Sequence, residues 1–276
     1  MELINFKVGC KTISLKILDI LLTERFNNNL TTLPNNNKSF IGVKDYMETP
    51  TPIFDLGIIL NGESTDKSNK SVLHALLNWE EQQTNWFNSL ELKLLNNTSL
   101  LSEYEAEQHE FESFYSDFKT DNDDLKLTMS RFEQPFKALV VTLKEAILSH
   151  NLGDKKHVKM LINHAKRDII IQLQRLFSSA KEQITLDYKP IIIFITNDGL
   201  TPYAGLLVDR VEDSIEYKKE DIKPLDKLTE VGFDIEPHTK SMMRGLVKLP
   251  NTHSILIDPN AIFNTEQPFT KKSHTS

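Results

Sequence analysis

Residues 2–17 read ELINFKVGCKTISLKI, and this stretch predicts how the fold begins. Apolar side chains occupy alternate positions on both sides of a single glycine: Ile4, Phe6, Val8, Ile13, Leu15 and Ile17. A period of two is typical of a strand with one buried face and one solvated face. Gly9 and Cys10 stand where a turn would join two such strands. The stretch therefore predicts a β-hairpin at the start of the chain.

The strand pattern continues to about residue 66 and returns after residue 188. Pro50 and Pro52 favour an edge or a turn, because proline cannot donate a hydrogen bond to a neighbouring strand. Residues 197–199, NDG, are typical of a hairpin turn, since glycine tolerates positive φ. Further strands are expected at 40–43, 53–56, 191–196, 205–209, 211–217, 243–249 and 254–257.

The intervening residues carry apolar side chains at the helical period, in four successive segments. Ser102 and Glu105 have the spacing of a capping box at the start of the second segment. Gly153 is placed to end the third helix, and Asp154 to cap the fourth. Four amphipathic helices in sequence predict a four-helix bundle. We therefore expect one β domain with a helical domain inserted into one of its loops.

Composition narrows the classes of function. The chain has 276 residues, 39% hydrophobic and 26% charged, with a formal net charge of −7. The acidic balance argues against nucleic acid or an anionic membrane as the main partner. Cys10 is the single cysteine, which excludes an intrachain disulfide and a cysteine-rich zinc site. Neither a phosphate-binding glycine loop nor a hydrolase motif occurs, so the residues favour no enzyme class.

The β segments resemble, in their order and spacing, the CheW-like domain of chemotaxis coupling proteins. The opening hairpin is similar to the first hairpin of that family, and GLLVDRV at 205–211 is similar to its G-L-x-V-D-x-V segment. The segments that carry the resemblance are 6–9, 13–17, 42–43, 52–56, 205–211, 222–224, 244–247, 255–258 and 261–263.

This resemblance implies an α+β multidomain fold, a CheW-like pair of small five-stranded β-barrels with an inserted four-helix bundle. The expected domains are the two β parts, 1–66 and 189–265, the bundle, 67–188, and a disordered tail, 266–276. It further implies a non-enzymatic scaffold that couples chemoreceptor tips to a CheA-type histidine kinase. We expect the protein in the cytoplasm, at membrane-associated or cytoplasmic receptor arrays. We expect no nucleic-acid partner and no direct membrane insertion, because no apolar run approaches the length of a membrane span.

The resemblance also assigns partner contacts, residue by residue. An Arg-Gly pair often stands in the family where this chain has Met47 and Glu48. The acidic replacement changes the charge offered to a receptor, and therefore the choice of partner. The predicted contacts are Val43, Tyr46, Met47 and Glu48 in one loop, with Leu206 and Val208 on a neighbouring strand.

The helical insert resembles the chemoreceptor zinc-binding (CZB) family, in FKTDN at 118–122 and FEQP at 132–135. That family binds zinc through a His on its first helix, a Cys on its second and a His pair after the Pro, a tetrahedral donor set. The aligned positions here are Gln83, His109, Phe136 and Val140. We therefore expect apolar packing in place of the metal, and no cofactor.

Other histidines and carboxylates leave some alternatives open. His157 and His164 are seven residues apart and share a helix face, but we interpret them as surface residues because no short two-ligand spacing occurs. The acidic run before His109 lacks the Glu-x-x-His spacing of a di-iron bundle. A sensory or regulatory role of the insert, or residual metal binding near His109, remains the alternative function. The sequence indicates neither the receptor nor the oligomeric state.

Overall fold

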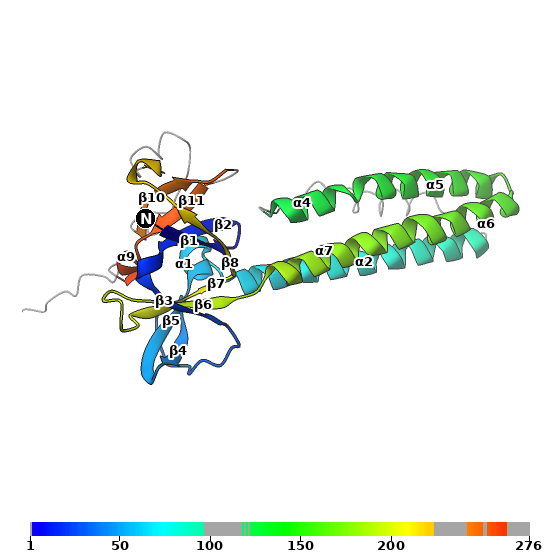
Figure 1. The fold of residues 1–276 in the computed structure, drawn as a ribbon. Helices are drawn as coiled ribbons and strands as arrows, with labels where there is room; N and C mark the ends of the chain where they lie inside the picture. The colour runs from blue at the N-terminus through cyan, green and yellow to red at the C-terminus, as the bar shows by residue number, and fades with distance from the viewer. Residues whose placement is uncertain are drawn as a thin grey trace, which may run out of the picture. The chain divides into compact units, whose positions relative to one another are not determined.

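A computed structural model describes residues 2–96, 118, 120, 122–223, 242–250 and 253–263 (Figure 1). The chain divides into two compact units. We call Met1–Lys67 with Tyr188–Ser276 the β unit, and Ser68–Asp187 the helical unit. Two sheets and a helical region make the fold α+β, as the sequence predicts. The predicted tail, 266–276, lies outside the described residues.

The first sheet contains the predicted opening hairpin. Ile4 pairs with Leu15 and Phe6 with Ile13, so the predicted hairpin is confirmed. Ile17 does not continue the second strand: it begins the 3-10 turn Ile17–Asp19, which leads to the other sheet. The strand order is β8-β1-β2-β11-β10-β9. The strands are β1 (Glu2–Val8), β2 (Lys11–Lys16), β8 (Arg210–Glu216), β9 (Ile222–Lys223), β10 (Met243–Lys248) and β11 (His253–Ile257).

The second sheet has five strands in the order β3-β6-β7-β5-β4. Pro50 and Pro52 lie in β5, which has a neighbour on each side. The pairing between β5 and β7 begins at Ile53, after both prolines, so they take no donor away from that ladder. In the ladder with β4, Pro52 lies opposite Val43 and Pro50 opposite Asp45, so the prolines belong to a strand rather than to the expected edge or turn. The strands are β3 (Ile20–Arg25), β4 (Phe40–Tyr46), β5 (Thr49–Asp55), β6 (Ile191–Ile195) and β7 (Ala204–Val208).

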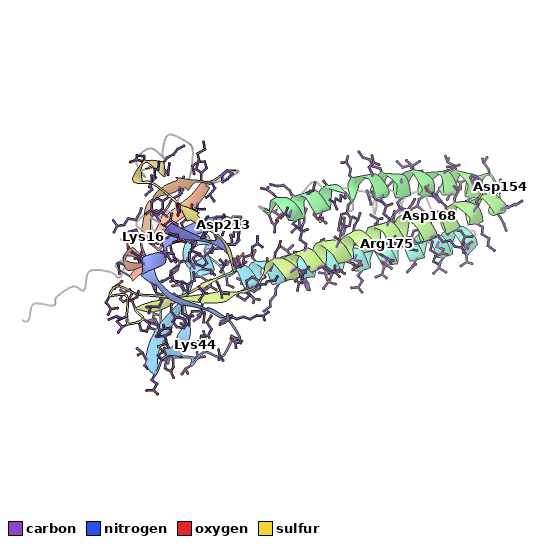
Figure 2. The ribbon with its side chains drawn as sticks, viewed as in Figure 1. Lys16, Lys44, Asp154, Asp168, Arg175 and Asp213 are labelled. Carbon is purple, nitrogen blue, oxygen red and sulfur yellow. The ribbon has the colours of Figure 1, made fainter. Side chains whose placement is uncertain are left out.

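In each sheet, side chains of the two edge strands share an ion pair or an apolar cluster. In the five-stranded sheet, Lys44 Nζ on β4 lies 2.7 Å from a Glu24 oxygen on β3 (Figure 2). In the six-stranded sheet, Ile215 of β8 and Ile222 of β9 pack against one apolar cluster. The β unit therefore contains the two sheets that the prediction requires, but one of them has six strands rather than five. The additional strand is the two-residue β9, which pairs with β10.

One apolar core joins the two sheets. Phe6 and Leu15 come from the first sheet, and Ile193 and Leu206 come from the second. Helix α1 (Leu56–Asn61), whose first turn is capped by the Asp55 carboxylate, contributes Leu56 and Leu60 to this core. A short helix, α9 (Pro259–Phe263), follows the last strand. Because strands from both ends of the chain share this core, the β unit is one body although its two parts are distant in sequence.

The helical unit consists of long helices with the predicted caps. Asp154 accepts a hydrogen bond from the His157 backbone N–H (3.0 Å) at the turn labelled in Figure 2, and Gly153, at φ +80°, ends the preceding helix. The helix predicted near Ser102 lies outside the described residues. The described helices are α2 (Thr65–Asn96), α4 (Asp123–Ser130), α5 (Glu133–Asn151), α6 (Lys155–His164) and α7 (Ile171–Asp187), with a π-helical segment, Ala165–Ile170, joining α6 to α7.

Aromatic rings form the centre of the helical core. Trp79 of α2 contacts Phe177 of α7, with ring centroids 5.0 Å apart and nearly perpendicular planes. Phe132, at the junction of α4 and α5, lies 4.8 Å from Phe177 and 5.8 Å from Trp79. Edge-on ring contacts of this kind stabilise a core beyond the area that they bury. One aromatic cluster therefore connects all three described stretches of helix.

Candidate functional site

Four of the six predicted contact residues lie together at one β-hairpin. Val43 and Tyr46 are on β4, while Met47 and Glu48 form the turn to β5. Tyr46 pairs with Thr49 across this turn. The structure therefore presents these four residues on one continuous element.

The turn itself is strained. Met47 has φ +47° and Glu48 has φ +66°, a left-handed pair that usually requires Asn and Gly. Left-handed backbone costs a residue with a side chain about 1–2 kcal/mol. The Met47 side chain is 83% exposed, so burial does not offset this cost. Strain that persists at an exposed position is typical of contact and recognition sites.

The base of the hairpin is rigid. The Tyr46 ring packs against Phe194 of β6, with centroids 4.9 Å apart. Val43 exchanges two backbone hydrogen bonds with Thr31, each 2.9 Å long. Lys44 adds the ion pair to β3 described above. A partner would therefore meet a preformed tip and would not have to order it on binding.

Leu206 and Val208 are placed differently. Their exposed fractions are 0% and 1%, and both belong to the core between the two sheets. Their side chains offer no surface to a partner in this structure. The signal was present in the sequence: Ala204–Val208 is apolar throughout, which is typical of a strand buried on both faces.

A second exposed apolar surface escaped the sequence analysis. Leu18, in the turn between β2 and β3, is 79% exposed, and Leu200, in the loop between β6 and β7, is 81% exposed. The two segments are neighbours because the Thr196 N–H donates to the Asp19 carbonyl (3.0 Å). No sequence period marks these residues, because both belong to irregular segments.

The loop that carries Leu200 is held by one carboxylate. Asp198 accepts hydrogen bonds from the backbone N–H groups of Leu200 and Thr201, both at 2.8 Å, and from two hydroxyls. These bonds, with that from the Thr201 hydroxyl first, hold the pKa of Asp198 well below its usual range. Strands β5 and β7 run parallel, so this loop and the Met47 turn lie at the same end of the five-stranded sheet.

The positions aligned with zinc ligands lie inside the helical core. Gln83, Phe136 and Val140 are all buried there, while His109 falls outside the described residues. Among the residues that the structure describes, no group of three histidine, cysteine or carboxylate side chains could hold a metal ion. His157 instead lies 3.1 Å from a Glu145 oxygen on the helix surface.

The chain is similar to known proteins at the level of structure. No protein-family model matches the chain, and no curated protein sequence matches it. A solved structure, the scaffolding protein TtCheW from Thermoanaerobacter tengcongensis, is similar with a TM-score of 0.41 and 11% sequence identity, over 94% of this chain and 84% of that chain. No helix within the described ranges is long and apolar enough to cross a membrane. We therefore argue function from the residues of this chain.

Proposed function

We propose that this protein is a non-enzymatic signalling scaffold of a chemotaxis-type array, which couples chemoreceptor tips to a CheA-type histidine kinase. The observation that carries the proposal is the pair of sheets. The segments that resemble the CheW-like family, from the opening hairpin to β11, form two sheets around one shared core. The inserted helical unit would act as an additional interaction or regulatory module.

The mechanism would be recognition by preformed surfaces. A coupling protein must bind two partners at once, which requires two accessible contact surfaces. The Met47–Glu48 turn and the Leu18–Leu200 surface each expose an apolar side chain, and each is held by contacts to neighbouring strands or turns. Rigid apolar anchors lower the entropic cost of binding. Because Glu48 adds a negative charge, we assign the turn to a receptor surface with a matching cation.

Binding measurements with the full-length chain test this proposal. The full-length chain is titrated with a CheA-type kinase and with the cytoplasmic fragment of a chemoreceptor, both encoded beside the gene of this chain. We expect saturable binding to both partners. The double substitution Met47→Asn, Glu48→Gly keeps the turn type and removes the side chains. We expect it to weaken receptor binding at least tenfold and to leave kinase binding unchanged.

A matched control is Met160→Asn, which removes an exposed methionine from α6. It should alter neither affinity. Binding to neither protein would reject the scaffold function. Binding to both, with equal affinity for the turn variant and the control, would reject the turn as the receptor contact.

The second candidate function is sensing or regulation through the helical unit. Gln83 is buried in the helical core, and its side-chain N–H₂ group has no hydrogen-bond partner among the described residues. A buried unpaired amide is costly, and such groups often mark a functional site. Metal analysis of the purified full chain tests the metal-binding form of this role. Stoichiometric zinc supports a metal-binding sensor, and the absence of zinc rejects that form.

A further inference from the structure

The chain passes between its two units at two points, both next to buried acidic groups. It leaves the β unit after Lys67, in the first turn of α2, and returns at Tyr188. Asp209, between β7 and β8, lies near both points at which the chain crosses between the units. Asp209 is 7% exposed and accepts a hydrogen bond from the Gly9 backbone N–H (2.5 Å).

Close packing fixes the position of this carboxylate. Gly9 has φ +61°, and a Cβ there would lie 2.9 Å from Asn61 Nδ2 and 3.9 Å from Thr65 Oγ1. The β1–β2 turn therefore packs directly against the start of α2. On the other side, the Lys189 backbone N–H donates to the Asp209 carbonyl oxygen (3.0 Å). Asp209 is thus held between the outgoing and the returning chain.

Like charges surround Asp209. Asp55 is equally buried, and it caps α1 by accepting a hydrogen bond from the Ile58 N–H (3.2 Å). Asp66 and the partly buried Tyr188 also act on the cluster, and Arg210 is the cation that favours ionised Asp209. Two buried carboxyl groups near one arginine, Asp55 and Asp209, cannot both ionise without cost.

The titration of these groups agrees with the geometry. Burial raises the pKa of Asp209 to about 6, and Asp55 adds to this, although the Gly9 N–H, the Thr65 hydroxyl and Arg210 oppose it. Burial also raises the pKa of Asp55. The pKa of Tyr188 is raised by burial and then by the three aspartates, so its hydroxyl stays protonated.

We propose that proton uptake by the buried Asp209 carboxyl group tightens the joint through which the chain enters and leaves the helical unit. A neutral Asp209 carboxyl group no longer repels Asp55, and its burial costs much less free energy than burial of the charged form. An ionised Asp209 carboxylate favours opening of the first turn of α2 and of the Tyr188 segment, because water can then reach the charge. The joint is a proton-operated device that acts independently of the partner contacts proposed above.

The direction of the effect follows from linkage. In the closed joint Asp209 binds its proton up to about pH 6, whereas an open, hydrated carboxyl group would lose it near 3.8. The closed form therefore holds more protons between these values, so the joint is most stable at the acidic end and loosens as pH rises through about 6. Each unit of difference between the two pKa values corresponds to about a tenfold change in the equilibrium constant for opening. Over the whole pH interval this constant therefore changes by up to about 100-fold.

Hydrogen exchange of the full chain measures this opening. We expect peptides covering 61–70 and 184–192 to lose protection at least tenfold between pH 5.0 and 7.5, after correction for the intrinsic exchange rate. A peptide covering 40–52, in the five-stranded sheet, serves as the internal reference. Asp209→Asn mimics the protonated group, so both junction peptides should then stay protected at every pH.

Two further variants separate the joint from a general effect of charge. Asp45→Asn removes an exposed carboxylate from β4 and should retain the wild-type profile. Asp55→Asn keeps a side chain that can cap α1 and removes the neighbouring charge that raises the pKa of Asp209, so it should move the midpoint of the transition to lower pH. The proposal is overturned if wild-type protection of the junction peptides is independent of pH, if Asp209→Asn retains the wild-type profile, or if Asp55→Asn leaves the midpoint unmoved.

Discussion

At the scale of single residues, the segment 205–211 illustrates what sequence can and cannot reveal. Its residue types follow from packing in the β unit: Gly205 allows close approach of β5 and β6, Leu206 and Val208 fill the shared core, and Asp209 is buried at the joint. The family resemblance therefore locates the fold well. Two of the contacts that it assigns, Leu206 and Val208, have buried side chains, because the residues that specify a buried strand are the ones that a partner cannot reach.

Gly205 provides a test of this packing. A Cβ at Gly205 would meet Ile53 Cδ1 and would lie 2.9 Å from Ile192 Cγ2. We expect Gly205→Ala to lower the free energy of unfolding by about 1–3 kcal/mol, as overpacked cores do. In an Ile53→Val background, which removes the obstructing methyl group, the same substitution should cost less. Urea denaturation of the four proteins of this cycle measures the difference, and an equal cost in both backgrounds would contradict the clash.

At the scale of elements, the period of apolar residues located the strands but not all of their partners. The parallel pairs β2–β11 and β5–β7 join segments from opposite ends of the chain. Periodicity shows which face of a strand is buried, and it carries no information on which distant strand lies beside it. The predicted NDG turn is part of a longer loop, because Thr196 and Asp198 form a network of side-chain hydrogen bonds around Gly199.

The aromatic cluster of the helical unit leads to a prediction about α7. Phe177→Ala would leave a cavity beside Trp79 and Phe132, in a core where Phe177 is fully buried. We expect a loss of about 3–5 kcal/mol in the stability of the helical unit. Leu186→Ala, at an exposed position of the same helix, should change stability by less than about 0.5 kcal/mol. Tryptophan fluorescence follows this unit, since Trp79 and Trp86 both lie in it; similar midpoints for the two variants would contradict the role of the cluster.

At the scale of the whole molecule, the two units have separate cores. Every buried residue of the helical core that the structure describes comes from the helical unit, and the shared core of the β unit draws on both of its sequence parts. A core that is complete within one unit is the main requirement for independent folding. The passages at Lys67 and Tyr188 both lie near Asp209, so a short linker can join them.

Excision of the insert is therefore the decisive experiment on the architecture. A chain in which a short Gly-Ser linker replaces residues 68–187 should fold, with a cooperative denaturant transition and a spectrum rich in β-structure. Because the Met47 turn and the Leu18–Leu200 surface belong to the β unit, we expect this protein to bind the kinase and the receptor fragment. Unchanged affinities for both partners would assign coupling to the β unit alone and would reject the regulatory role of the helical unit. A change in either affinity would show that the helical unit adjusts coupling. Failure of the excised chain to fold, with several linker lengths, would contradict the independence of the two cores.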